Sequence, residues 1–128
     1  MKIALDTNVL VRIITGDKED MVSRAKGLIK RHGPKEIFIT YGVVLETYYV
    51  LKTFYGFKEQ EALAAMKDIL HIEQFAFEHE IAIRLALSKT EKGFGFYDAL
   101  IGEIAGLKNL KTCTFDKGLK ENKNFELI

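Results

Sequence analysis

Four acidic residues, spread over the whole sequence, are the side chains best placed to do chemistry: Asp6, Glu46, Asp98 and Asp116. Asp6 directly follows an apolar run that ends at Leu5, and Asp116 directly follows the run 111–115. Carboxylates are preferred ligands of Mg²⁺ and Mn²⁺, and these cations activate water and stabilise the charge that develops when a phosphodiester is hydrolysed. Gathered in one place, the four acids would need such cations, because close carboxylates raise each other's pKa.

Each aspartate also has a purely structural interpretation. An aspartate in front of a helix is commonly its N-cap, because the carboxylate accepts a backbone N–H at the first turn. Asp6, Asp98 and Asp116 all stand at or near the start of an expected helix. Asp98 has apolar and aromatic neighbours, which indicates a partly buried edge. For each aspartate taken alone, capping remains an open alternative.

Glu46 lies in the middle of a segment, 41–55, that is apolar nearly all round. The residues one helical turn away from it carry no cation. A buried carboxylate without a partner is expensive and would normally take up a proton. A metal ion would remove that penalty. The alternative is that this face of the helix reaches solvent.

The bulk composition is that of an ordinary globular protein. A chain of 128 residues, with 48% hydrophobic and 29% charged residues, is expected to form one domain with a proper core. The net charge of +1 leaves only a local patch for binding nucleic acid. The single cysteine, Cys113, excludes an internal disulfide and is expected to be a small buried apolar residue. Without a signal peptide or an apolar run long enough to span a bilayer, the expected location is the cytoplasm.

Short apolar segments alternate with segments of helical periodicity along the chain. Strands are expected at 2–5, 36–39, 72–75, 111–115 and 125–128, and helices at 7–15, 17–31, 41–55, 58–70, 78–89 and 96–107. Gly16 and Gly56 are expected to end helices, and Thr40 to cap one. This alternation predicts an α/β domain with a mostly parallel sheet. Ligands of such sheets bind beyond the carboxyl ends of the strands, which is where Asp6 and Asp116 stand.

Four segments of the chain resemble, in order and spacing, the acidic motifs of PIN-domain ribonucleases: LDTNVL at 5–10, LE at 45–46, YDALI at 97–101 and TFDK at 114–117. The closer likeness is to the VapC toxins of toxin–antitoxin pairs, which the segments 11–17 and 50–56 also resemble. Essentially the whole chain is covered. The resemblance implies a single PIN-like nuclease domain over residues 1–128, with a three-layer α/β/α fold around a central, mostly parallel sheet.

The resemblance also implies roles for individual residues. It makes the four acids the ligands of Mg²⁺ or Mn²⁺ in an endoribonuclease, with Asn8 and Thr114 as supporting polar residues. Thr114 and Asp116 are two residues apart, so strand alternation would place both on one face. Many relatives carry a further acid three residues before the third motif aspartate, whereas this chain has Gly95. The resemblance finally implies a homodimer and, as in VapC proteins, inhibition by a small antitoxin.

Lysines are concentrated near the carboxyl end of the chain. Residues 108–123 contain five lysines, among them Lys111, Lys117 and Lys120, against two acids. They would suit a patch that steers a phosphate backbone, and the alternative is an ordinary solvated surface.

Two other classes of protein compete with the nuclease interpretation. A haloacid-dehalogenase-like phosphatase also begins with a strand-end aspartate, but it requires a second aspartate two residues later, where this chain has Asn8. A PIN fold without catalysis would act as a binding or scaffold module, and the presence of all four acids argues against it.

Overall fold

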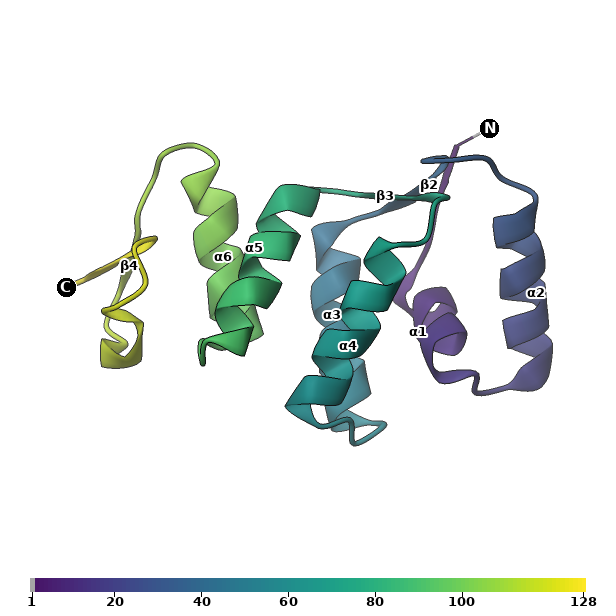
Figure 1. Cartoon of the computed structure of the whole chain (residues 1–128), viewed down its shortest axis with the longest axis horizontal. Helices are drawn as coiled ribbons and strands as arrows, with labels where there is room; N and C mark the ends of the chain where they lie inside the picture. The colour runs from purple at the N-terminus through teal and green to yellow at the C-terminus, as the bar shows by residue number, and fades with distance from the viewer. Residues whose placement is uncertain (1) are drawn as a thin grey trace. The chain divides into compact units, whose positions relative to one another are not determined.

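The computed structural model describes residues 2–128 and divides the chain into two compact units, Met1–Glu78 and His79–Ile128 (Figure 1). The first unit contains β1 (Ile3–Ala4), α1 (Thr7–Thr15), α2 (Glu19–Lys30), β2 (Ile37–Ile39), α3 (Tyr41–Thr53), α4 (Glu59–Leu70) and β3 (Phe75–Phe77). The second contains α5 (Glu80–Glu91), α6 (Phe96–Gly106), β4 (Thr112–Thr114), the 3-10 helix η1 (Lys117–Leu119) and β5 (Phe125–Leu127). Within residues 2–128, every helix is too short or too polar to cross a bilayer.

The sheet of the first unit has the order β1–β2–β3, and both strand pairs are parallel, as the sequence predicts. Ile37 of the central strand pairs with Ile3 on one side and with Phe75 on the other. Ile37, Ile39 and Phe75 are fully buried and form the centre of the core of this unit. Because the strands are parallel, the residues that follow them all emerge at one edge of the sheet.

The turn between α1 and α2 is held by backbone geometry and by a small polar cluster. Gly16 ends α1 in the left-handed region, with φ of 69°, and its N–H donates to the carbonyl of Arg12 at 2.9 Å. The Arg12 guanidinium donates to the Tyr55 hydroxyl at 2.8 Å, and that hydroxyl donates to Asp17 at 2.9 Å. The cluster ties this turn to the residues just after α3.

In the second unit, α5 and α6 pack against each other through apolar faces, and β4 pairs in parallel with β5. The approach of β5 to α6 is so close that a Cβ on Gly102 would lie only 2.6 Å from the Phe125 ring. Lys89 of α5 forms an ion pair with Glu103 of α6 at 2.5 Å. The absence of a side chain at Gly102 thus permits the close approach of β5 to α6, and an ion pair joins α5 to α6.

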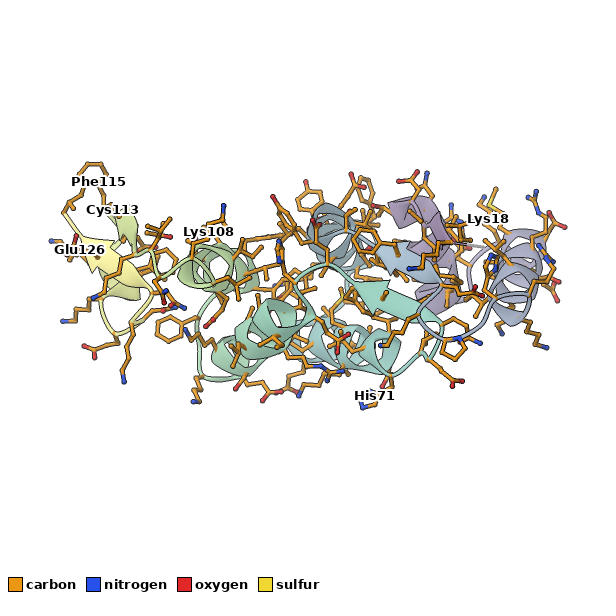
Figure 2. All side chains as sticks on the ribbon, turned by 90° about the horizontal axis from the view of Figure 1, so that it is seen from above. Lys18, His71, Lys108, Cys113, Phe115 and Glu126 are labelled. Atoms are coloured by element: carbon orange, nitrogen blue, oxygen red, sulfur yellow. The ribbon has the colours of Figure 1, made fainter. Side chains whose placement is uncertain are left out.

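Two expectations about strands are wrong. The third strand begins at Phe75 rather than at Ile72, because the residues after α4 first form a turn in which the Phe75 N–H donates to the Ile72 carbonyl at 3.0 Å. Cys113 is exposed rather than buried. Strand alternation turns Thr112 and Thr114 to the half-buried face of β4 and Cys113 to the other. Figure 2 shows Cys113 beside Phe115, whose side chain is 83% exposed.

The junction between α3 and α4 is held by the carboxylate of Glu59. Lys52 donates to Glu59 Oε2 at 2.6 Å, and the Tyr48 hydroxyl donates to the same oxygen. Burial pushes the pKa of Glu59 upward, but the hydrogen bonds from Lys52 and Tyr48 outweigh it and hold the pKa below its ordinary value. The ionised form is therefore the one that stabilises this junction.

Glu59→Gln is expected to lower the free energy of unfolding by up to about 1 kcal/mol near neutral pH, the size of a partly exposed ion pair. Because the pKa of Glu59 is lowered in the folded state, this contribution is present above the ordinary carboxyl range and disappears as the pH falls through the lowered pKa. Urea unfolding curves at several pH values measure the difference between variant and wild type. A difference that stays constant down to strongly acidic pH would contradict the assignment, and Glu73→Gln, at an exposed position, serves as the control.

Candidate functional site

Asp6 lies at the carboxyl end of β1 and is the N-cap of α1. Its Oδ1 accepts a hydrogen bond from the Thr7 N–H at 2.8 Å, so the capping role is confirmed. A carboxylate has two oxygens with several acceptor positions, and Asp6 can hold the helix with one while binding a cation with the other. Capping and metal binding are compatible roles for this side chain.

Glu46 is exposed, so of the two interpretations left open for this residue the buried carboxylate is wrong. Helix α3 buries Val44, Thr47, Tyr48 and Leu51, and this stripe of one helical face leaves Glu46 on the solvent side. The alternative, in which this face reaches solvent, is the one that holds. What remains in favour of a functional role is the place of Glu46 in the motif order, together with its accessibility to a ligand.

Asp98 is half-buried in the first turn of α6. The N-cap of this helix is Gly95 rather than Asp98, so the capping alternative does not apply to this residue. An acid in the first turn still benefits from the positive end of the helix dipole. A Cβ built on Gly95 would lie 4.0 Å from Asp98 Oδ2, which makes Gly95 a direct neighbour of the carboxylate.

Asp116 is exposed, follows β4 and is the N-cap of η1. Its Oδ1 accepts a hydrogen bond from the Gly118 N–H at 2.8 Å. Its own backbone N–H donates to the hydroxyl of Thr114 at 3.0 Å. Thr114 therefore holds the backbone of Asp116 in place, which is a contact that fits the supporting role expected of it.

Each unit thus holds two of the four acids, Asp6 and Glu46 in the first and Asp98 and Asp116 in the second. In residues 2–128 no three side chains of the types His, Cys, Asp and Glu lie close enough to hold a metal ion. Asn8 is exposed on α1, two residues after Asp6. The four-acid metal site accordingly stays a prediction.

Glu78 is an acid at the same sheet edge that the sequence interpretation missed. It directly follows β3, and its backbone N–H donates to the Ile39 carbonyl at 2.9 Å. Its carboxylate accepts a hydrogen bond from the Tyr41 N–H at 3.0 Å, at the first turn of α3, the helix that carries Glu46. An acid directly after the apolar triplet 75–77 was the available signal, and the misplaced third strand concealed it.

Lys111, Lys117 and Lys120 are all exposed. Lys117 lies in η1, next to Asp116, and Lys120 ends this short helix. Exposed lysines fit both the steering patch and the ordinary solvated surface.

A family model described as "PIN domain" matches residues 3–124 and so runs through both units. The match confirms the predicted three-layer α/β/α class with a mostly parallel sheet. Among curated proteins, no sequence matches the chain.

Solved structures with chains similar to this one include three from bacteria. One is VapBC2 from Rickettsia felis bound to a DNA fragment from its promoter, with 20% identity, coverage of 100% of this chain and 98% of that chain, and a TM-score of 0.42. Another is VapC20 of Mycobacterium tuberculosis, described as a sarcin–ricin loop cleaving toxin, with 17% identity, coverage of 95% of each chain and a TM-score of 0.45. The third is a toxin–antitoxin complex from Klebsiella pneumoniae, with 19% identity, coverage of 100% of this chain and 96% of that chain, and a TM-score of 0.38.

Because Asp6 caps α1, two substitutions of this residue should differ in their effect on stability. Asp6→Asn keeps an oxygen acceptor for the Thr7 N–H, and asparagine and aspartate are about equally good N-caps, so the free energy of unfolding should change little. Asp6→Ala removes the acceptor and should lower it by about 1 kcal/mol. Urea unfolding without divalent metal measures both, and equal stability of the two variants would contradict the cap.

Proposed function

Because the chain belongs to the PIN domain family, we propose that it is an endoribonuclease that uses Mg²⁺ or Mn²⁺ to hydrolyse RNA. The observation that carries the proposal is the presence of all four acidic motifs, in order, within the matched range. Asp6, Glu46, Asp98 and Asp116 are the proposed metal ligands and catalytic residues.

The side chains of the proposed site fit a hard divalent cation. All four donors are carboxylates, and Asp6 and Asp116 each cap a helix through Oδ1 alone, so Oδ2 of each can serve a metal. The caps reduce the freedom of both side chains, and Thr114 fixes the backbone of Asp116. A bound Mg²⁺ or Mn²⁺ supplies an activated water and stabilises charge on the reacting phosphate. The contribution of the chain is to hold carboxylates in the required orientation before the cation arrives.

The likeness of the motifs to VapC toxins extends the proposal to a toxin that acts as a homodimer and is inhibited by a small antitoxin. A short neighbouring reading frame that encodes a DNA-binding protein would support this extension, and an isolated gene would count against it. A haloacid-dehalogenase-like phosphatase predicts phosphate release from small phosphoesters instead, and a scaffold module predicts no hydrolysis.

Each of the substitutions Asp6→Asn, Glu46→Gln, Asp98→Asn and Asp116→Asn is expected to lower kcat/KM for single-stranded RNA by roughly 100-fold or more, since each removes one charge from the metal site. Chelation with EDTA should stop cleavage, and added Mg²⁺ or Mn²⁺ should restore it. Asp68→Asn, an exposed acid of α4, is the control and should retain wild-type cleavage. If the folded, metal-loaded wild type cleaves no RNA, the proposal fails.

Gly95→Asp should strengthen metal binding, because the new carboxylate would lie beside Asp98. Gly95 has φ of −66°, which any residue adopts, so the substitution introduces no backbone strain. The Mg²⁺ concentration that gives half-maximal cleavage should fall several-fold, and without metal the two like charges should lower the melting temperature. Gly95→Asn, with the same shape and capping ability but no charge, is the matched control. The same Mg²⁺ dependence in both variants would contradict the expectation.

A further inference from the structure

Helices α1 and α2 of the first unit pack side by side (Figure 1). Side chains from both helices line a groove. Its cavity has a volume of about 360 Å³. Three arginines line it, Arg12 from α1 and Arg24 and Arg31 from α2 and its C-cap, and we call it the arginine groove. Asn8 and several apolar side chains, among them Val9 and Leu28, complete the lining, to which the described residues contribute no carboxylate.

The charges of the arginine groove are only weakly compensated. Arg24 pairs with Asp20 at 3.2 Å, but 71% and 84% of the two side chains are exposed, and such pairs contribute little. Arg12 uses one nitrogen for the Tyr55 hydroxyl and lies 3.9 Å from Asp17. Its Nε is buried and, among residues 2–128, has no hydrogen-bond partner. A ligand cannot reach this buried atom, but Arg24 and Arg31 are exposed, so an anion in the groove can pair with their guanidinium groups.

We propose that the arginine groove binds a nucleotide of the RNA strand that flanks the nucleotide being cut. This inference rests on the proposed function and adds to it a site for substrate recognition. Guanidinium groups match phosphate oxygens in pairs, and their planes, like apolar side chains, accept unstacked bases. A groove that combines three guanidinium groups with an apolar floor therefore suits single-stranded RNA better than an inorganic anion, which would leave the apolar floor unused.

The position of the groove on α1 relates it to the proposed site. Asp6 caps α1, Asn8 lies at the groove in the first turn, and Arg12 follows six residues after Asp6. At the rise of an α-helix, six residues span about 9 Å. The groove thus begins next to Asp6 and leads away from it, which suits a neighbouring nucleotide rather than the scissile phosphate. Asn8 lines the groove and would contact the strand where it leaves Asp6.

The test is the affinity for a fluorescein-labelled single-stranded RNA, measured by fluorescence anisotropy without divalent metal so that nothing is cleaved. The double variant R24A/R31A should bind about tenfold more weakly than wild type, which corresponds to about 1.4 kcal/mol. If both arginines contact phosphates, the slope of log K against log salt should decrease in magnitude by about 1.4. The matched control is K26A/K30A, which removes two exposed cations of the same helix that do not line the groove.

Equal affinity of R24A/R31A and K26A/K30A for RNA would overturn the inference. If R24A/R31A binds RNA like the control but loses binding of a glutamate-rich amphipathic peptide, the groove serves an acidic protein segment instead, which also overturns it. A second measurement, cleavage of the same RNA by the wild type in the presence of Mg²⁺, distinguishes failure of the nuclease proposal from failure of the groove proposal. Arginine-dependent binding without any cleavage would refute the nuclease and leave the groove as an RNA site. Cleavage with unchanged affinity of R24A/R31A would refute the groove alone.

Discussion

In the first unit, the parallel pairing of β1, β2 and β3 determines where the polar groups of the candidate site lie. Three strands that run the same way deliver Asp6, Thr40 and Glu78 to one edge of the sheet. Each of them begins or supports a helix there: Asp6 caps α1, and Thr40 and Glu78 accept N–H groups from the first turn of α3. Groups that satisfy the backbone of these helices thus gather at the edge where an α/β sheet binds its ligands.

Using a carboxylate as a helix cap has a consequence for chemistry. A capped aspartate has one oxygen committed to a backbone N–H, so the direction of the other oxygen is restricted as well. Asp6 in the first unit and Asp116 in the second are held in this same way, through Oδ1 and a hydrogen bond of 2.8 Å. Side chains that are oriented before the ligand arrives lose less entropy when they bind it. The capping role and the proposed catalytic role, which compete when only the sequence is known, are therefore compatible, because each would use a different oxygen of the carboxylate.

Local features of the chain could be predicted from the sequence, and features that depend on distant partners could not. The bounds of α1 are determined by Asp6 at its start and Gly16 at its end, and the role of each residue can be recognised from the local sequence alone. The start of β3 depends on the pairing of Phe75 with Ile37, which lies 38 positions earlier in the chain, and the sequence interpretation placed this strand three residues too early. The exposure of Glu46 follows from the buried stripe of α3, which the nearly uniform apolar composition of that helix concealed. That four acids from distant segments share one site stays a prediction, because it depends on contacts between residues far apart in the chain. It came from the strand-end positions of Asp6 and Asp116 and from the resemblance of the motifs.

Under the proposed function, a chain with a net charge of +1 has an electrostatic difficulty, because the four carboxylates would repel the RNA phosphates until a metal is bound. Bulk charge cannot offset this repulsion, so the attraction must come from cations concentrated near the acids. The exposed lysines at 111, 117 and 120 provide mobile, strongly hydrated charge that acts at a distance and is screened by salt. The arginines between α1 and α2 line a cavity with apolar walls, where an anion is less well screened and a base has a surface to pack on. If the proposed function holds, the arginines are therefore better suited to bind an RNA strand beside Asp6, and the lysines to attract it from a distance.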